Sequence, residues 1–209
     1  MIRLPDFRMW LRDAAGRGWR DDRAAQLVEF AVSLPLLVVF VVGIFDFSNA
    51  FTLKQKLTNA VRDGARVAAA DPASDLSSPI SAPTSVIDAF QVVHNNLVAN
   101  NINDCGIPGA TAPTSTSGLT WTYTGTTSCP PGGLTIIINR GYYFPATGAT
   151  LPSVTCTSQN PGGQTAVIGT CVSIQYAYPW RFGKVASLLG SAASLPTQVT
   201  AAAVAMNEN

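Results

Sequence analysis

Few side chains in this sequence could carry out chemistry. The only histidine is His94, and a lone histidine is far more often a surface residue than a metal ligand or a catalytic base. The 209 residues contain no H-E-x-x-H, paired C-x-x-C, phosphate-binding Walker loop or G-x-S-x-G. We therefore expect a protein that is not an enzyme and that uses no metal and no cofactor.

The four cysteines are the remaining reactive groups. An even number in an exported domain predicts two disulfides, formed in an oxidising compartment. Their spacing does not suit a zinc site. We favour the pairs Cys105–Cys129 and Cys156–Cys171, because each pair would close a short loop rich in glycine and proline. The other pairings, and four buried thiols, remain open.

Glu29 lies near the start of an apolar run that covers residues 27–47. As a helix this run would be about 30 Å long, which matches the hydrocarbon core of a bilayer. A cleaved signal peptide would have a shorter apolar region followed by a small-residue cleavage site, so we expect an anchor that stays. A carboxylate is costly in lipid, and Glu29 either has a partner there or reaches the headgroups.

Charge is scarce, which suits a domain outside the cytosol. Charged residues make up 12% of the chain and the net charge is +1, so no basic field points to nucleic acid. The arginines of residues 1–24 favour a cytoplasmic N-terminus, against the basic residues between 54 and 66 on the other side. A reversed topology would place the cysteines in a reducing compartment.

The helix should continue beyond the membrane through residues 49–71. Its apolar positions recur at helical spacing and shrink from leucine to alanine and glycine, so that another backbone can approach closely. Asp71-Pro72 ends the pattern, and Pro35 should kink the helix or loosen its hydrogen bonding. The predicted inward face consists of Ala50, Leu53, Leu57, Ala60, Val61, Gly64, Ala65 and Ala68.

The rest of the chain should form a domain of mixed helix and strand. A connector over residues 72–84 leads to a second helix from Ser85, which is spaced from Asp88 like a capping box. Clusters of glycine and proline then separate short runs with β-strand character. The predicted strands cover residues 119–123, 134–139, 172–178 and 198–206, the last of which could instead be an alanine-rich helix.

The most aromatic stretch covers residues 176–182. We expect Tyr176 and Tyr178 to alternate in a strand, while Trp180 and Phe182 cover the core. The alternatives are a binding surface, or a domain edge that rests on the membrane as an interfacial aromatic belt.

One ordered set of residues resembles a known family. A Glu-Phe pair, a Leu-Pro pair, a glycine and a Gly-Ala-Arg block occur here in the order found in TadE-like proteins, the pseudopilins of tight-adherence (Tad, or Flp) pilus systems. The resemblance covers about residues 24–70. It is carried by AAQLVEFA at residues 24–31, Leu34-Pro35, Gly43, Asp46-Phe47 and LTNAVRDGARVA at residues 57–68.

The resemblance implies proteolytic processing. TadE-like proteins resemble type IV prepilins, whose leader is removed by a prepilin peptidase shortly before the Glu-Phe pair. Carried onto this sequence, the cut falls between Ala24 and Ala25, ahead of Glu29 and Phe30. The family usually has glycine before the cut, and Ala24 stands there instead. The freed amine of Ala25 could pair with Glu29 of a neighbouring subunit and set the stagger of packed helices.

The resemblance also assigns packing roles along the helix. It makes the Asp-Gly-Ala-Arg segment a junction between helix and domain, whereas a solvated face is the alternative reading of its charged residues. The residues expected to serve helix packing or this junction are Pro35, Gly43, Gly64, Ala65 and Arg66.

These expectations combine into one interpretation. We expect a type IV pilin-like α+β fold, in which a long N-terminal helix packs on a small antiparallel sheet with one further helix. The protein would be a TadE-like minor pilin or pseudopilin in the inner membrane, with its C-terminal domain periplasmic or extracellular. Its partners would be other pilins, the prepilin peptidase and the assembly platform, and no nucleic acid. An unprocessed, membrane-anchored binding module is the main alternative, and an exported enzyme is a weaker one. The segments are a leader (1–24), a transmembrane helix (25–48), its continuation (49–71) and the domain (72–209).

Overall fold

The fold is known from a computed structural model. The chain divides into two compact units, Met1–Phe47 and Ser48–Asn209, and one continuous helix contributes to both. The residues that the structure describes are 22–77, 82–145, 155–157, 166–181 and 195–208.

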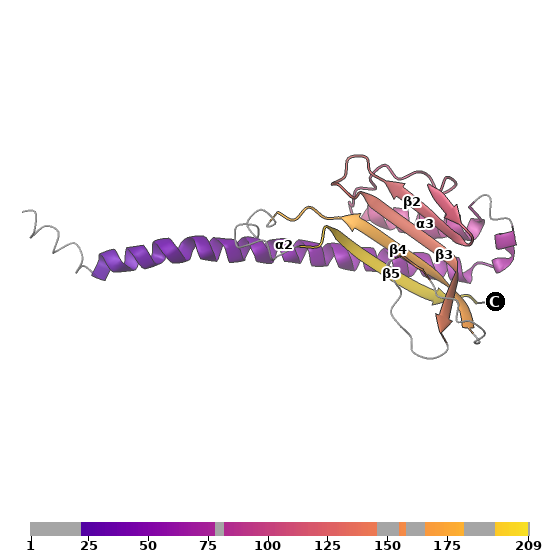
Figure 1. Cartoon of the computed structure of the whole chain (residues 1–209), viewed down its shortest axis with the longest axis horizontal. Helices are drawn as coiled ribbons and strands as arrows, with labels where there is room; N and C mark the ends of the chain where they lie inside the picture. Colours follow the sequence, from indigo (N-terminus) through magenta and orange to yellow (C-terminus); the bar gives the residue numbers. More distant parts are fainter. Residues whose placement is uncertain (1–21, 78–81, 146–154, 158–165, 182–194, 209) are drawn as a thin grey trace, which may run out of the picture. The chain divides into compact units, whose positions relative to one another are not determined.

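Three helical elements and five strands make up these residues (Figure 1). The strands form one antiparallel sheet in the order β1-β2-β3-β4-β5, so that each strand pairs with its neighbour in sequence. The elements are α2 (Asp22–Ala70), the 3-10 helix η1 (Ala73–Ser77), α3 (Thr84–Ala99), β1 (Ser115–Ser117), β2 (Thr120–Gly125), β3 (Leu134–Pro145), β4 (Ala166–Ala177) and β5 (Gln198–Met206).

Helix α2 has 49 residues and continues through Pro35 without a break. It ends at Ala70, one residue before the Asp71-Pro72 pair that predicts the stop, because proline disfavours the helical conformation in the residue before it. The backbone N–H of Asp71 still donates to the carbonyl of Val67 (3.3 Å), which closes the last turn.

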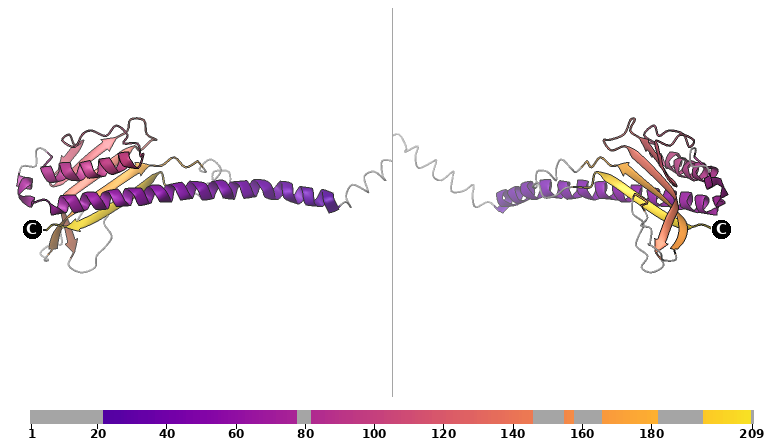
Figure 2. Two further views of the ribbon diagram at one scale, coloured as in Figure 1. Left: turned by 180° about the vertical axis from the view of Figure 1, so that it is seen from behind. Right: turned by 45° about the vertical axis from the view of Figure 1, so that its right-hand side comes forward.

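In the second unit, one face of the sheet carries the core. Alternate residues of paired strands point to this face, as in the cross-strand row of Trp121, Ile138 and Val172, all of which are fully buried. The domain part of α2 and α3 cover it, and Figure 2 shows both helices on this side of the sheet. The predicted α+β fold, with a long helix and one further helix on an antiparallel sheet, is confirmed.

Helix α3 contributes its predicted apolar face. Val86, Phe90, Val93 and Leu97 are buried, and the Phe90 ring lies 4.4 Å from that of Tyr123 on β2, measured between centroids. Burial raises the pKa of Tyr123 to about 12, and its hydroxyl donates to the carbonyl of Ala110 (2.8 Å), which offsets the cost of burying it.

The predicted capping box at the start of α3 is wrong. Pro83 occupies the N-cap position, and no side chain of the helix caps its own first turn. The N–H of Ser85 instead donates to Oδ2 of Asp75 (2.9 Å), which comes from η1. The carboxylate of Asp75, ten residues before Ser85, therefore caps the first turn of α3, which the local spacing predicts for Ser85 and Asp88.

The strands agree with the prediction except at their ends. β5 has the predicted bounds, but β4 ends at Ala177, so Tyr178 follows the strand rather than lying in it. β3 continues past Asn139 across a change of register before Tyr142. The three polar residues of β1 are exposed and form a strand that periodicity could not reveal.

Candidate functional site on the N-terminal helix

In the first unit, α2 exposes a continuous apolar surface. Leu27, Phe30 and Phe40 are each more than 60% exposed, and most large apolar side chains between residues 27 and 47 share this exposure. By length and composition, the helix is long and apolar enough to cross a membrane. An apolar surface of this extent needs lipid or protein around it.

The residues expected at the processing site lie together near the start of this helix. Ala24, Ala25, Glu29 and Phe30 all fall within α2, and Glu29 and Phe30 are exposed. Ala25 and Glu29 are four residues apart, so they share one helix face. The Ser33 hydroxyl donates to the backbone carbonyl of Glu29, not to its side-chain carboxylate. Residues 1–21 of the leader lie outside the described residues.

In the second unit, the domain part of α2 packs closely against α3 at Gly64. A Cβ atom added at Gly64 would lie 2.6 Å from Cγ2 of Val93 and 3.3 Å from the carbonyl oxygen of Ala89. Because only glycine fits at that distance, the two helix backbones approach through this residue. Ala65 is buried, whereas Arg66 is exposed. Pro35 and Gly43, the other residues expected to serve packing, lie in the first unit.

The charged residues of the same block point away from the core. Arg62, Asp63 and Arg66 are exposed, on the side of α2 opposite its buried face. No ion pair joins them within the described part of the chain. This exposure fits the alternative in which the charged residues form a solvated face of the helix. The buried residues of the block that contact the rest of the domain are Gly64 and Ala65.

Arg140 forms a contact that sequence reasoning missed. This residue is fully buried in β3, on the face that packs against α2. Its Nη1 donates to the carbonyl of Ala68 and to Oγ1 of Thr170 (2.9 Å), and Nη2 donates to the carbonyl of Asp71 (3.0 Å). The last carbonyls of a helix lack partners within it and carry the negative end of its dipole, so a guanidinium suits this position.

The charge of Arg140 is compensated by more than hydrogen bonds. Burial lowers the pKa of Arg140, and the carboxylates of Asp75 and Asp71 act in the opposite direction. Arginine nevertheless remains charged in proteins. The helix end and these two carboxylates therefore hold a buried cation.

The C-terminal segment closes over the same helix end. Oγ1 of Thr170 donates to Oδ1 of Asn207 (2.8 Å), and the N–H of Glu208 donates to the carbonyl of Ala69 (3.2 Å). We call Arg140, Thr170 and Asn207 the helix clamp. The clamp ties the end of α2 to β3, β4 and the residues after β5. A lone arginine in the apolar run LTIIINRGYYF was the available signal for it.

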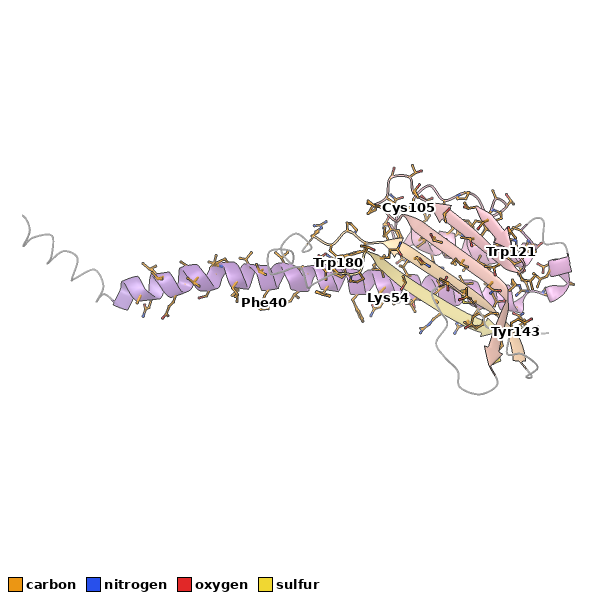
Figure 3. The ribbon with its side chains drawn as sticks, viewed as in Figure 1. Phe40, Lys54, Cys105, Trp121, Tyr143 and Trp180 are labelled. Atoms are coloured by element: carbon orange, nitrogen blue, oxygen red, sulfur yellow. A yellow bond between two sulfur atoms is a disulfide. The ribbon has the colours of Figure 1, made fainter. Side chains whose placement is uncertain are left out.

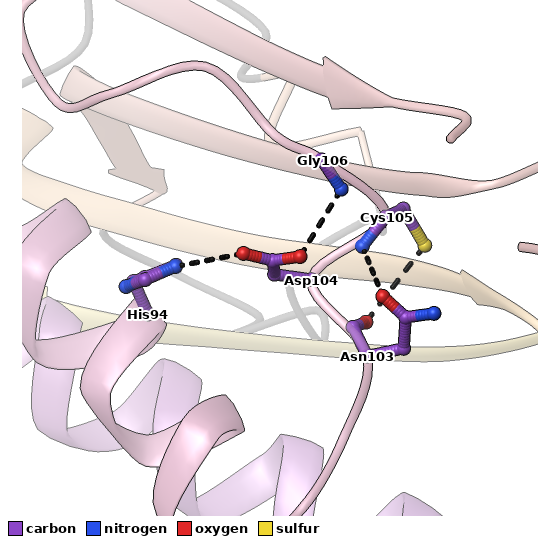
Figure 4. A network of polar contacts seen from close by, with 5 residues as sticks. All are labelled: His94, Asn103, Asp104, Cys105 and Gly106. Atoms are coloured by element: carbon purple, nitrogen blue, oxygen red, sulfur yellow. Dashed lines mark hydrogen bonds and ion pairs between the residues drawn. The ribbon is translucent and has the colours of Figure 1, made fainter. Parts of the chain in front are cut away.

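His94 belongs to a polar network on the surface of the domain (Figure 4). Its Nε2 lies 3.2 Å from Oδ2 of Asp104, and Oδ1 of that carboxylate accepts the N–H of Gly106 (3.1 Å). The hydrogen bond from Gly106 and the contact with His94 lower the pKa of Asp104. Asn103 accepts the N–H of Cys105 through its side chain (2.9 Å). The network shapes the turn before a cysteine and holds no nucleophile.

The structure contains two disulfides, Cys105–Cys129 and Cys156–Cys171, which are the two pairs favoured from the sequence. The second pair belongs to a small cluster with Tyr142 on the face of the sheet away from the helices. A shallow cavity of about 360 Å³ lies beside it. Its lining carries hydroxyl and amide groups but no charged side chain: Leu119, Thr120, Asn139, Gly141, Tyr143, Thr155, Cys156 and Thr157.

Among the described residues, no group of three or more His, Cys, Asp or Glu side chains could hold a metal ion. The main functional feature is therefore helix α2, whose first part exposes apolar side chains and whose last part packs into the core of the domain. This helix also contains the ordered motif of residues 24–68.

Comparison with protein families decides what this helix resembles. The family model described as TadE-like protein matches residues 24–66. This segment is similar to TadE-like proteins. The match begins at Ala24 and ends at Arg66, so it spans the processing residues, the apolar surface and Gly64. A search of curated proteins and a search of solved structures each returned no match.

The match covers 43 of the 209 residues. It covers α2 alone and stops before α3 and the sheet. The family relation of the chain therefore rests on the helix, and the domain is characterised by its own geometry.

Proposed function

We propose that the chain is a TadE-like minor pilin or pseudopilin that takes part in assembling or priming a Tad-type adhesion pilus. The observation that carries this proposal is the TadE-like segment itself, residues 24–66, on a helix whose apolar side chains are exposed through residue 47. Such a helix can lie in a membrane before assembly and among other pilin helices afterwards, because both surroundings cover apolar surface.

Glu29 has a defined part in this proposal. Removal of the leader before Ala25 would create an α-amino group close to the membrane boundary. A carboxylate and an ammonium group that pair in an apolar setting offset part of the desolvation of both. Pairing with Glu29 of a neighbouring subunit would fix the axial stagger between helices. Pairing within one chain is the competing geometry, since Ala25 and Glu29 share a helix face.

The domain would act by position and recognition rather than by catalysis. The helix clamp and the close approach at Gly64 make the domain part of α2 rigid with the sheet. The partners would be other pilins, the prepilin peptidase and the membrane proteins of the assembly platform, with the domain in the periplasm or outside the cell.

A second candidate is a permanently anchored binding module that is never processed. The specific observation in its favour is Ala24, which stands where TadE-like proteins usually have glycine. Its extra methyl group would have to fit the peptidase site. In this candidate Glu29 has no freed amine to pair with and serves as a boundary residue.

The mature N-terminus separates the two candidates. We would extract the protein from membranes of its native host and measure its intact mass, together with the variants Ala24→Gly and Ala24→Val. We expect wild type and Ala24→Gly to begin at Ala25, and Ala24→Val to keep Met1 because a β-branched side chain is bulkier. A wild type that keeps Met1 while Ala24→Gly is cut would refute the processed pilin, since the variant proves that the peptidase is active.

A further inference from the structure

Two aromatic side chains form a corner at one end of the domain. Tyr178 and Trp180 follow β4, and their rings meet edge to face with centroids 4.9 Å apart. The N–H of Tyr178 donates to the carbonyl of Thr197 (3.0 Å), and the indole N–H of Trp180 donates to the carbonyl of Pro196. We call residues 178–181 with 195–197 the aromatic corner.

Trp180 does not cover the core as expected. The core cluster of described residues contains Tyr176 but neither Tyr178 nor Trp180, and both of these are half-buried. Pro179 and Arg181 beside them are exposed. Phe182, the other residue expected over the core, lies outside the described residues. In Figure 3, Trp180 and Lys54 lie towards the same end of the domain, whereas Trp121 and Tyr143 lie towards the other end.

Two contacts fix how β5 runs along the domain part of α2. Near its start, β5 contacts the helix through the Lys54 ammonium group, which donates to the carbonyl of Thr200. Just after its end, the N–H of Glu208 donates to the carbonyl of Ala69. Residue numbers rise together in the two elements. β5 therefore runs in the same sense as α2, and residues before Thr200 lie towards the start of the domain part of the helix.

The height of the corner along α2 follows from these contacts. Pro196 precedes Thr200 by four residues, which is about 13 Å of extended chain. Between the two contacts, the helix rises about 22 Å from Lys54 to Ala69 while the chain from Thr200 to Glu208 extends about 26 Å, a ratio of about 0.85. At that ratio 13 Å of chain corresponds to about 11 Å along the helix axis, or about seven helical residues. Counting back from Lys54, the corner lies at about the level of residues 47–48. That is where the apolar run ends, because Ser48 and Asn49 follow Phe47.

The side chains at this level have the chemistry of a membrane interface. Tryptophan and tyrosine have an apolar body and a polar end, and both are enriched at the headgroup level. Phe51 on α2, about one helical turn further along, is 64% exposed. Arg181 and Lys54 add positive charge, which the phosphate groups of lipid headgroups attract.

We propose that the aromatic corner rests on the lipid interface, with Tyr178 and Trp180 at headgroup level near Phe51. The inference rests on the membrane anchor in the proposed function. The corner would hold the domain against the bilayer at a fixed height until the subunit leaves the membrane.

Tryptophan fluorescence in lipid nanodiscs tests this directly. The full chain would be placed in nanodiscs that contain lipids brominated either near the carbonyl end or near the methyl end of their acyl chains. The variant Trp10→Phe/Trp19→Phe keeps Trp121 and Trp180, and adding Trp180→Phe leaves Trp121 alone. The difference between the two spectra isolates Trp180 without a change in the core. Trp121 is fully buried in the sheet and serves as an internal control.

We expect lipids brominated near the carbonyl end to remove most of the Trp180 emission, and lipids brominated near the methyl end to remove less. Trp121 emission should not change. A further variant, Phe40→Trp added to the triple variant that keeps only Trp121, reports on the anchor and should be quenched most by bromine near the methyl end. Unquenched Trp180 with a quenched reporter at position 40 would refute the corner and leave the anchor intact. If neither is quenched, the anchor and the corner are both wrong.

Discussion

At the scale of single residues, Arg140 shows how a charge can be buried at low cost. Its donors face carbonyls that α2 cannot satisfy itself, and the helix dipole and two nearby carboxylates favour its charge. Its Nε has no hydrogen-bond partner among the described residues. The benefit therefore comes from the two terminal nitrogens, which connect β3 to the helix end.

Replacing Arg140 should destabilise the domain strongly. In Arg140→Met the buried carbonyl of Ala68 and the partly buried carbonyl of Asp71 lose their donor, and an unsatisfied buried group costs about 1–3 kcal/mol. We expect the free energy of unfolding to fall by about 2–4 kcal/mol, measured by urea denaturation in detergent and followed by Trp121 fluorescence. Arg66→Met on the exposed face of α2 is the matched control and should change it by less than about 0.5 kcal/mol. Equal effects of the two variants would contradict the clamp.

Asp104 should make the free energy of unfolding depend on pH in the acidic range. Its pKa is lowered by the hydrogen bond from Gly106 and by His94, so the folded state binds the carboxylate's proton less readily than the unfolded state. The stabilisation is therefore complete above the unfolded pKa of about 3.9 and is lost as pH falls through the lowered folded pKa. We expect Asp104→Asn to lose stability less steeply than wild type between about pH 5 and about pH 2.

The matched control for this pH effect is Asp63→Asn, on the exposed face of α2. Its acid profile, measured in the same urea titrations, should follow that of wild type. An Asp104→Asn profile parallel to wild type would show that the network in Figure 4 does not contribute to acid sensitivity.

At the scale of elements, the residue pattern predicts features that depend on neighbouring residues in the sequence, but not contacts between distant segments. The end of α2 and the apolar face of α3 follow from spacing within a few residues. Residues 198–206 fit a strand or an alanine-rich helix, and their pairing with β4 makes them a strand. Arg140 could not be placed this way, because its partner Ala68 is 72 residues away in sequence. The cap on α3 could not be predicted for the same reason, since Asp75 reaches it from another element.

The contact between α2 and α3 makes Gly64 intolerant of larger side chains. In Gly64→Val the added Cβ would start 2.6 Å from Cγ2 of Val93, which is itself fully buried and β-branched. Overpacking of this kind costs about 1–3 kcal/mol. We expect that loss in the free energy of unfolding, measured by urea denaturation. Asn59→Val places the same residue on the exposed face of the same helix, and its effect should stay within about 0.5 kcal/mol.

At the scale of the whole molecule, the TadE-like helix and the domain obey different constraints. Residues 24–66 carry the family pattern, and they combine an apolar exterior with one close helix contact. The domain carries two disulfides and an uncharged cavity instead. Within the second unit, the clamp and the Gly64 contact tie the domain part of α2 to the sheet and to α3.

The disulfides connect stability with the side of the membrane on which the domain lies. Cys156 and Cys171 close a loop of 15 residues, and a loop of that size contributes about 3 kcal/mol on a chain-entropy model. Cys156→Ser/Cys171→Ser should therefore lower the free energy of unfolding by about that amount. Because disulfides persist only in an oxidising compartment, wild-type protein acid-quenched from native membranes should resist alkylation until a reductant is added. Alkylation of all cysteines before reduction would place the domain in the cytosol and exclude the proposed orientation of α2.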